Sequence, residues 1–311
     1  MLTRLRILII TGWLLGLAGA AAQAATVIVI VSSERSPAYT EAGEALILAL
    51  ERNGVSRYDM LQQTLPEFRN AGKVSPKLFV ALGSEAALAL AKADLQAPIL
   101  SALLPRSSFE RVLLESKRRP SAQFSVIYLD QPMSRQLDLI RLALPAAKHL
   151  GVLWGPDSKQ QTTALKAGAL TRGLEVVDAS VTASELLFPS LKRVLEAADV
   201  LLGVPDPLVF NNNSIQNILL SSFRAKVPLV GFSPAYVRAG ALFALYATPS
   251  QIGFQAATLA TGVLQGKAVL PEPVYSQDFT VSVNEHVARA LGLSLDASAL
   301  TTRLRNLEGS K

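Results

Sequence analysis

Residues 27–54 read VIVIVSSERSPAYTEAGEALILALERNG, and this stretch decides the fold. Its first five residues form an unbroken β-branched run, which is typical of a strand buried on both faces of a parallel sheet. Ser36-Pro37 then supplies a helix N-cap and a first-turn proline, and Gly54 ends a helix predicted over residues 38–53. A buried strand followed by a helix is the unit from which doubly wound α/β folds are built.

The same alternation of buried strand and helix occurs in two successive sets along the chain. Strands are predicted over residues 27–31, 78–82, 98–103 and 125–129, and then over 150–154, 174–177, 200–202, 228–230 and 241–247. About 287 residues follow the N-terminal segment described next, which is more than one core usually accommodates. We therefore predict an α/β protein with two doubly wound, Rossmann-like lobes joined by a multi-strand hinge.

The first 24 residues have the pattern of a secretory signal peptide. A basic start that includes Arg4 and Arg6 precedes an apolar run over residues 7–22 and the small-residue exit Ala22-Gln23-Ala24. The alternative is a membrane anchor, but that needs about twenty apolar residues and this run is shorter. The chain has no cysteine, which excludes a lipid-modified export signal, a disulfide and a thiolate metal site. We expect a periplasmic protein without a lipid anchor.

The charge of the chain gives no sign of a nucleic-acid partner. The formal net charge is +6, and cleavage after residue 24 would remove Arg4 and Arg6 and lower it to +4. The basic residues are scattered rather than arranged in a stripe. The densest cluster, Lys117-Arg118-Arg119, is expected to be a solvated loop.

The signatures of common enzyme classes are absent from the sequence. It has no glycine-rich dinucleotide fingerprint, phosphate loop, nucleophile elbow or His-Glu-x-x-His motif. The two histidines, His149 and His286, lie at element boundaries without a paired ligand motif, which favours structural or surface roles. We predict a protein that is not an enzyme and that holds no cofactor and no metal.

Candidate ligand-binding residues follow the predicted strands, because ligands of open α/β sheets bind at the carboxyl ends of the strands. Each candidate also has an ordinary interpretation, since serine and aspartate cap helices and aromatic side chains pack in cores. The first lobe supplies Ser32, Ser33, Glu34, Gly83, Ser84, Glu85 and Ser101. The second lobe supplies Trp154, Asp157, Pro205, Asp206, Phe232, Ser233 and Tyr246.

Two groupings of these candidates suggest how a ligand would be held. Glu34 and Asp206, from opposite lobes, would hold a ligand ammonium when the cleft shuts. Trp154, Phe232 and Tyr246 would sandwich a planar ligand. A hydrolase or transferase that uses the same two acids is a further hypothesis, motivated by Glu34 and Asp206 alone. Asp130, by contrast, is expected to cap a helix that runs on to Pro145.

Several short motifs, in their order and spacing, resemble the ABC-transporter substrate-binding family that contains tryptophan- and tyrosine-binding proteins. In the second half they are DVLLGVPD at 199–206, KVPLVGFS at 226–233, VRAGA at 237–241, LQGK at 264–267 and ALGL at 290–293. LGSEA at 82–86 and GVLWG at 151–155 lie where the family has its corresponding turns. VSSERS at 31–36 and YLDQP at 128–132 look more like a proteobacterial, non-lipoprotein subgroup.

This resemblance implies a type I periplasmic binding protein with its ligand between two lobes. The implied N-terminal lobe is 26–126 plus 248–275, and the implied C-terminal lobe is 128–247 plus 277–311. The leading hypothesis is a monomeric solute-binding protein that closes on a small, amino-acid-like organic molecule for an ABC importer and docks on its permease. The alternative is a periplasmic sensor or accessory module that serves a signalling protein or an outer-membrane receptor without transport.

Overall fold

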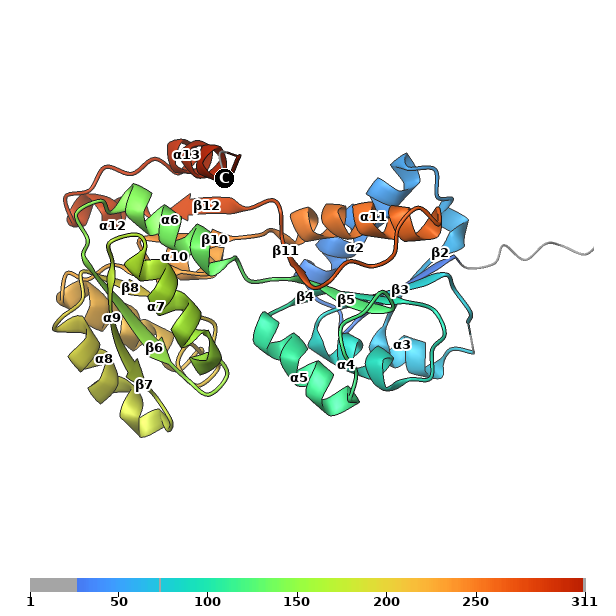
Figure 1. Cartoon of the computed structure of the whole chain (residues 1–311), viewed down its shortest axis with the longest axis horizontal. Coiled ribbons are helices and arrows are strands. Elements are labelled where there is room, and N and C mark those ends of the chain that lie inside the picture. The colour runs from blue at the N-terminus through green and yellow to red at the C-terminus, as the bar shows by residue number, and fades with distance from the viewer. Residues whose placement is uncertain (1–26, 73, 310–311) are drawn as a thin grey trace, which may run out of the picture.

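Two six-stranded sheets form two lobes that lie side by side (Figure 1). The computed structural model describes residues 27–72 and 74–309, so the predicted signal peptide lies outside the described residues. In these two ranges, no helix combines the length and apolar character that a membrane crossing requires.

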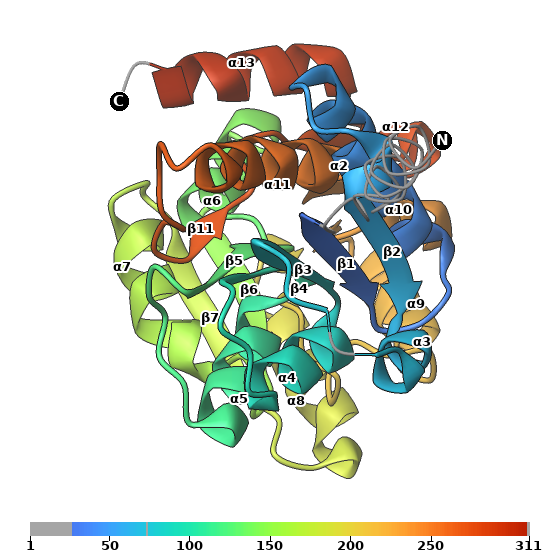
Figure 2. The same ribbon diagram turned by 90° about the vertical axis from the view of Figure 1, so that its right-hand side faces the viewer.

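The sheet of the first lobe is entirely parallel, with the strand order β2-β1-β3-β4-β5-β11. Helices α2 and α11 cover one face of this sheet, and α3, α4 and α5 lie on the other (Figure 2). The strands are β1 (Ile28–Ser32), β2 (Met60–Thr64), β3 (Leu78–Leu82), β4 (Ile99–Leu104), β5 (Phe124–Tyr128) and β11 (Val274–Tyr275). The helices are α2 (Pro37–Arg52), α3 (Leu65–Asn70), α4 (Ser84–Lys92), α5 (Arg106–Ser116) and α11 (Pro249–Leu264), with a 3-10 turn η1 (Arg57–Asp59).

The sheet of the second lobe has the corresponding order β12-β10-β9-β8-β6-β7, in which only the edge strand β12 is antiparallel. Its strands are β6 (His149–Trp154), β7 (Glu175–Ser180), β8 (Val200–Leu202), β9 (Leu229–Gly231), β10 (Phe243–Tyr246) and β12 (Thr280–Val283). Its helices are α6 (Met133–Ala143), α7 (Thr162–Leu170), α8 (Leu187–Leu195), α9 (Ile215–Arg224), α10 (Pro234–Ala239), α12 (Glu285–Ala290) and α13 (Ala297–Gly309), with 3-10 turns η2 (Lys159–Gln161) and η3 (Ser184–Leu186).

The predicted fold class, two doubly wound α/β lobes, is confirmed. The exact lobe boundaries stay a prediction, although the sheet composition assigns β11 to the first sheet and β12 to the second. The sequence interpretation missed β2, α3 and β11. The MLQQT sequence of β2 lacks a buried apolar run because β2 is an edge strand whose residues are half-buried or exposed, and β11 is only two residues long.

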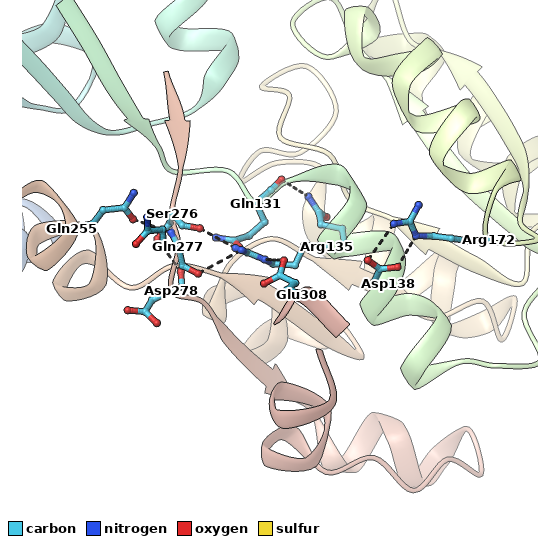
Figure 3. A network of polar contacts seen from close by, with 10 residues as sticks. Gln131, Arg135, Asp138, Arg172, Gln255, Ser276, Gln277, Asp278 and Glu308 are labelled. Atoms are coloured by element: carbon cyan, nitrogen blue, oxygen red, sulfur yellow. Dashed lines mark hydrogen bonds and ion pairs between the residues drawn. The ribbon is translucent and has the colours of Figure 1, made fainter. Parts of the chain in front are cut away.

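The chain passes between the lobes three times, and the buried side chain of Arg135 ties two of these crossings together (Figure 3). Its guanidinium donates to Gln131 Oε1 at 2.8 Å in the first crossing and to the Ser276 carbonyl at 2.9 Å in the third. It also pairs with Glu308 of α13 at 2.6 Å and lies over the ring of Phe279. Because a buried guanidinium must keep its partners, these contacts fix the crossings beside each other.

Helices α2 and α11, far apart in sequence, pack closely because Gly253 has no side chain. A Cβ at this position would lie 2.4 Å from the Ala42 carbonyl oxygen and 2.9 Å from the Ala45 Cβ. A backbone atom cannot move aside as a flexible side chain can. The glycine therefore sets the distance between α2 and α11, the helix that follows the second crossing.

We expect Gly253→Ala to lower the free energy of unfolding by about 1–3 kcal/mol, because the methyl group would force α2 and α11 apart. The matched control is Gly262→Ala on the same helix, where the nearest atom is the Ala268 Cβ at 3.2 Å. That change should be neutral or stabilising by up to about 1 kcal/mol, as alanine is a better helix former. Urea unfolding followed by circular dichroism measures both, and equal effects would contradict the packing argument.

Candidate ligand-binding site

A cavity of about 490 Å³ lies between the lobes beside two of the three crossings. It is bounded by residues that follow β4 and β5 of the first lobe and β8, β9 and β10 of the second, so the carboxyl ends of both sheets meet there. Its volume is in the range of small-molecule sites. The lining residues are Glu41, Pro105, Leu129, Asp130, Gln131, Gln136, Pro205, Phe232, Ser233, Pro234, Leu245, Tyr246, Ala247, Thr248 and Pro249.

The charged groups among these residues are two carboxylates, Glu41 of the first lobe and Asp130 of the first crossing. Asp130 lies at the start of the first crossing, where it accepts a hydrogen bond from the backbone N–H of Arg106 at the first residue of α5. Burial raises the pKa of Asp130 to about 6, although this hydrogen bond and the Arg106 charge both lower it. Asp130 thus caps α5, and the expectation that it would cap α6 is wrong: the N-cap of α6 is Pro132.

The second carboxylate, Glu41 of α2, contacts the N-terminus of α11. Its Oε1 accepts from both the backbone N–H and the hydroxyl of Ser250, at 3.2 and 2.7 Å. Thr248 and Gln251 form a reciprocal capping box at the same helix end. The first-turn donors of α11 at Ser250 and Gln251 therefore already have acceptors within the protein.

Two glutamines on the floor of the cavity have unsatisfied polar atoms. Gln131 is 5% exposed and Gln136 is 6% exposed. The Gln131 Oε1 accepts from Arg135, and its Nε2 has no partner among the described residues. The Gln136 Nε2 donates to the Gln131 carbonyl, and its Oε1 has no partner there either. Buried polar atoms without partners are uncommon in folded proteins, so these two glutamines are unusual among the lining residues.

The aromatic wall of the cavity comes from the second lobe. Phe232 follows β9 and packs against Tyr236, with ring centroids 4.5 Å apart, and against the edge of Phe210. Tyr246 ends β10 and its hydroxyl pairs with Ser282 on β12 at 2.7 Å. Both rings are thus held by their own lobe and present a preformed apolar surface to the cavity.

Of the fourteen residues predicted from the strand ends, the cavity brings together four: Pro205, Phe232, Ser233 and Tyr246. The first-lobe candidates other than Ser101 lie at the ends of β1 and β3, outside the lining of the cavity. Ser33 accepts from the Ala86 N–H and donates to the Leu82 carbonyl, so it stabilises the turn at Gly83. Of the remaining first-lobe candidates, Ser32 is buried at the end of β1, Ser84 is half-buried, and Glu34 and Glu85 are exposed. Whether any of them contacts a ligand stays a prediction.

Ser101 is a correction to the sequence interpretation. It lies inside β4 rather than at its carboxyl end, it is fully buried, and its hydroxyl has no partner among the described residues. Ser101 is nominated as a strand-end residue although it already falls inside the strand predicted over residues 98–103, and β4 (Ile99–Leu104) encloses it.

The contacts of Asp206 and Trp154 differ from the two groupings suggested by the sequence. Asp206 is 3% exposed and accepts from Asp157 N, Ser158 Oγ and Leu208 N at 2.9–3.0 Å, so both its oxygens serve its own lobe. The structure therefore offers no Glu34–Asp206 clamp. Trp154 is 2% exposed in the core, with its Nε1 donating to Asp178, and does not join Phe232 and Tyr246 in a sandwich.

Asp157 has a different role, because it connects the lobes. Its carboxylate pairs with Arg111 of α5, and Gln160 Nε2 beside it donates to Glu110 Oε2 at 3.0 Å. These contacts join α5 of the first lobe to the segment that follows β6 of the second. They are partly exposed, so their contribution to stability is small.

The sequence interpretation missed most of the polar lining, namely Glu41, Asp130, Gln131, Gln136 and Thr248. Asp130 and Gln131 both follow a buried strand, so the strand-end rule could have found them. A helix comes next in the sequence, however, and this favoured a helix-capping role for Asp130. Glu41 and Gln136 lie inside helices, where no strand-end rule would find them.

A larger hollow of about 790 Å³ lies at the opposite end of the second lobe. Its lining comes from the segments that precede β6, β8 and β9, so it lies at the amino ends of the parallel strands. Ligands of doubly wound sheets bind at the carboxyl ends, which favours the cavity between the lobes as the site. Within residues 27–72 and 74–309, no group of three or more potential ligands is placed to hold a metal ion.

Comparison with known proteins agrees with this architecture. A family model described as ABC transporter substrate binding protein matches residues 58–303. A curated tyrosine-binding protein of Clostridioides difficile is 26% identical over 272 residues, which cover 83% of this chain and 78% of the relative.

Solved structures show the same fold. The ligand-free, open structure of a Clostridium difficile substrate-binding protein with adhesive properties has a TM-score of 0.70 at 23% identity, covering 88% of this chain and 96% of that one. A Streptococcus pneumoniae ABC domain in complex with L-Trp has a TM-score of 0.62 at 18% identity, covering 88% and 97%.

We expect Asp130→Asn to raise the free energy of unfolding at pH 7 by up to about 3 kcal/mol. The folded protein holds the Asp130 proton up to a pKa of about 6, whereas the ordinary value is 3.8. The native protein therefore loses stability as the pH rises from about 4 to about 6, and the asparagine variant does not. Urea titrations at pH 4, 5, 6 and 7 measure the difference.

The control for this prediction is Glu51→Gln, which removes an exposed carboxylate from α2. Its effect should stay within about 0.5 kcal/mol at each pH. A stability difference between Asp130→Asn and the native protein that does not change with pH would contradict the assignment.

Proposed function

The chain belongs to the ABC transporter substrate-binding protein family, and from this premise we propose that it works in the periplasm as the solute-binding subunit of an ABC importer. Its ligand is a small, amino-acid-like organic molecule with an apolar body. Closure of the two lobes around this molecule presents it to the permease, and the protein performs no covalent chemistry.

The observation that carries the proposal is the cavity between the lobes. It is mostly apolar, it is bounded by the carboxyl ends of both sheets, and it borders two of the three crossings between the lobes. A ligand seated there contacts both lobes at once, so its binding favours the closed arrangement. The curated relative named as a tyrosine-binding protein supports the amino-acid-like class, and the alternative sensor role has no specific observation in its favour.

We expect native mass spectrometry of the protein, purified from its own periplasm, to show a co-purified small molecule of amino-acid-like size. The Phe232→Ala variant should lose this molecule, because truncation removes the aromatic wall of the cavity and lowers affinity by about tenfold or more. Phe188→Ala, an exposed phenylalanine of α8 outside the cavity, is the matched control and should retain it.

The transport role has its own measurement. Deletion of the gene should reduce uptake of the molecule identified by mass spectrometry, and the native gene should restore it. Unchanged uptake in the deletion strain, with no permease and ATPase genes nearby, would mean that the protein binds its ligand for another purpose.

A further inference from the structure

The charged side chains that line the cavity are all acidic. Glu41 and Asp130 both line it, and no lysine, arginine or histidine of the described residues does. A carboxylate on the ligand would therefore enter an apolar space that already holds two acids. Like charges in a site of low polarity repel strongly, and an unpaired buried anion is costly.

Two arginines, Arg106 and Arg135, are sequence neighbours of lining residues, and both already have partners elsewhere. The guanidinium of Arg106 binds Glu110 at 2.8 Å and reaches the Tyr275 hydroxyl at 3.4 Å. That of Arg135 is held by Gln131, Glu308 and the Ser276 carbonyl. Moving either side chain toward the ligand would break these contacts.

The N-terminus of α11, whose residues Thr248 and Pro249 line the cavity, does not replace them. Backbone N–H groups at a helix N-terminus often bind anions. At the start of α11, however, Glu41 accepts from Ser250, and the Thr248 hydroxyl accepts from the backbone N–H of Gln251. The Thr248 N–H in turn donates to the Gln251 side chain. The protein's own acceptors, one of them a carboxylate, thus already occupy this anion-binding position.

The remaining unsatisfied atoms are neutral. Gln131 Nε2 and Gln136 Oε1 belong to neutral side-chain amides, they have no partner among the described residues, and both residues are more than nine-tenths buried. A neutral amide suits a neutral polar partner. It does not balance a carboxylate, which only accepts.

We propose that the cavity selects a primary amine with an apolar, aromatic body and no carboxylate, rather than a zwitterionic amino acid. The ammonium pairs with Asp130, with Glu41 at the mouth of the cavity adding to the negative potential, and the ring lies against Phe232. This inference rests on the proposed function and narrows its ligand class.

Isothermal titration with matched pairs tests the proposal. The probes are tyramine against L-tyrosine, tryptamine against L-tryptophan, and 2-phenylethylamine against L-phenylalanine. At pH 7.5 each amine should bind at least about tenfold more tightly than its amino acid. L-Tyrosinamide, which keeps the bulk of tyrosine but has a neutral amide in place of the carboxylate, should bind more tightly than L-tyrosine.

Two substitutions test which group holds the ammonium. Asp130→Asn should weaken tyramine binding by at least about tenfold and reduce its advantage over L-tyrosine. Glu41→Gln should weaken it less, because Glu41 is exposed and already accepts from Ser250. Glu51→Gln, which removes an exposed charge of the same helix outside the cavity, should leave it unchanged. Thermal unfolding checks that each variant is folded.

Each other outcome overturns the inference. If the amino acids bind as tightly as the amines, the ligand class is wrong while the proposed function stands. If L-tyrosinamide binds as weakly as L-tyrosine, size rather than charge excludes the amino acid. If none of the probes binds, the cavity does not take aromatic amines, and the molecule found by native mass spectrometry decides the proposed function separately.

Discussion

The buried guanidinium of Arg135 is the contact on which the arrangement of the two lobes depends. A charge removed from water is tolerated only when hydrogen bonds and a counter-charge replace its hydration. Here the partners come from three separate segments: Gln131 in the first crossing, the Ser276 carbonyl in the third and Glu308 in the C-terminal helix. The crossings can separate only by leaving that charge without partners. The lobes are therefore joined at one edge and meet with the carboxyl ends of their strands.

The polar groups of the cavity follow from this constraint. Gln131 lines the cavity and has its Oε1 engaged by Arg135, while its Nε2 is buried without a partner among the described residues. Asp130, one residue earlier, caps α5 and is half-buried where the first crossing leaves the sheet. Burial disfavours the charged form of this carboxylate, and a cation placed beside it would favour that form. Stability is thus given up at the position where binding has most to gain.

The sequence predicted the fold far better than the site, and particular residues show why. The apolar runs that become β1, β3 and β6 are buried on both faces, so their composition alone identifies them. The half-exposed edge strand β2 carries no such signal. For the site, the strand-end rule found Phe232 and Tyr246 because it depends only on local order. It could not find Glu41 or Gln136, which lie within helices and reach the cavity through the packing of whole elements. Nor could it show that the oxygens of Asp206 are already occupied by its own lobe.

The position of the cavity next to the crossings also determines how binding and closure are linked. A ligand shifts the balance between open and closed lobes only by its difference in affinity for the two states. Asp130 and Thr248 lie on the crossings themselves, and Phe232 lies on the opposite lobe. A ligand that contacts only the crossings would bind both states alike and leave the balance unchanged. In the proposed closing motion, a ligand that spans from Asp130 to Phe232 would gain its second contact as the lobes approach, so its apolar body, more than its charge, would supply the free energy of closure.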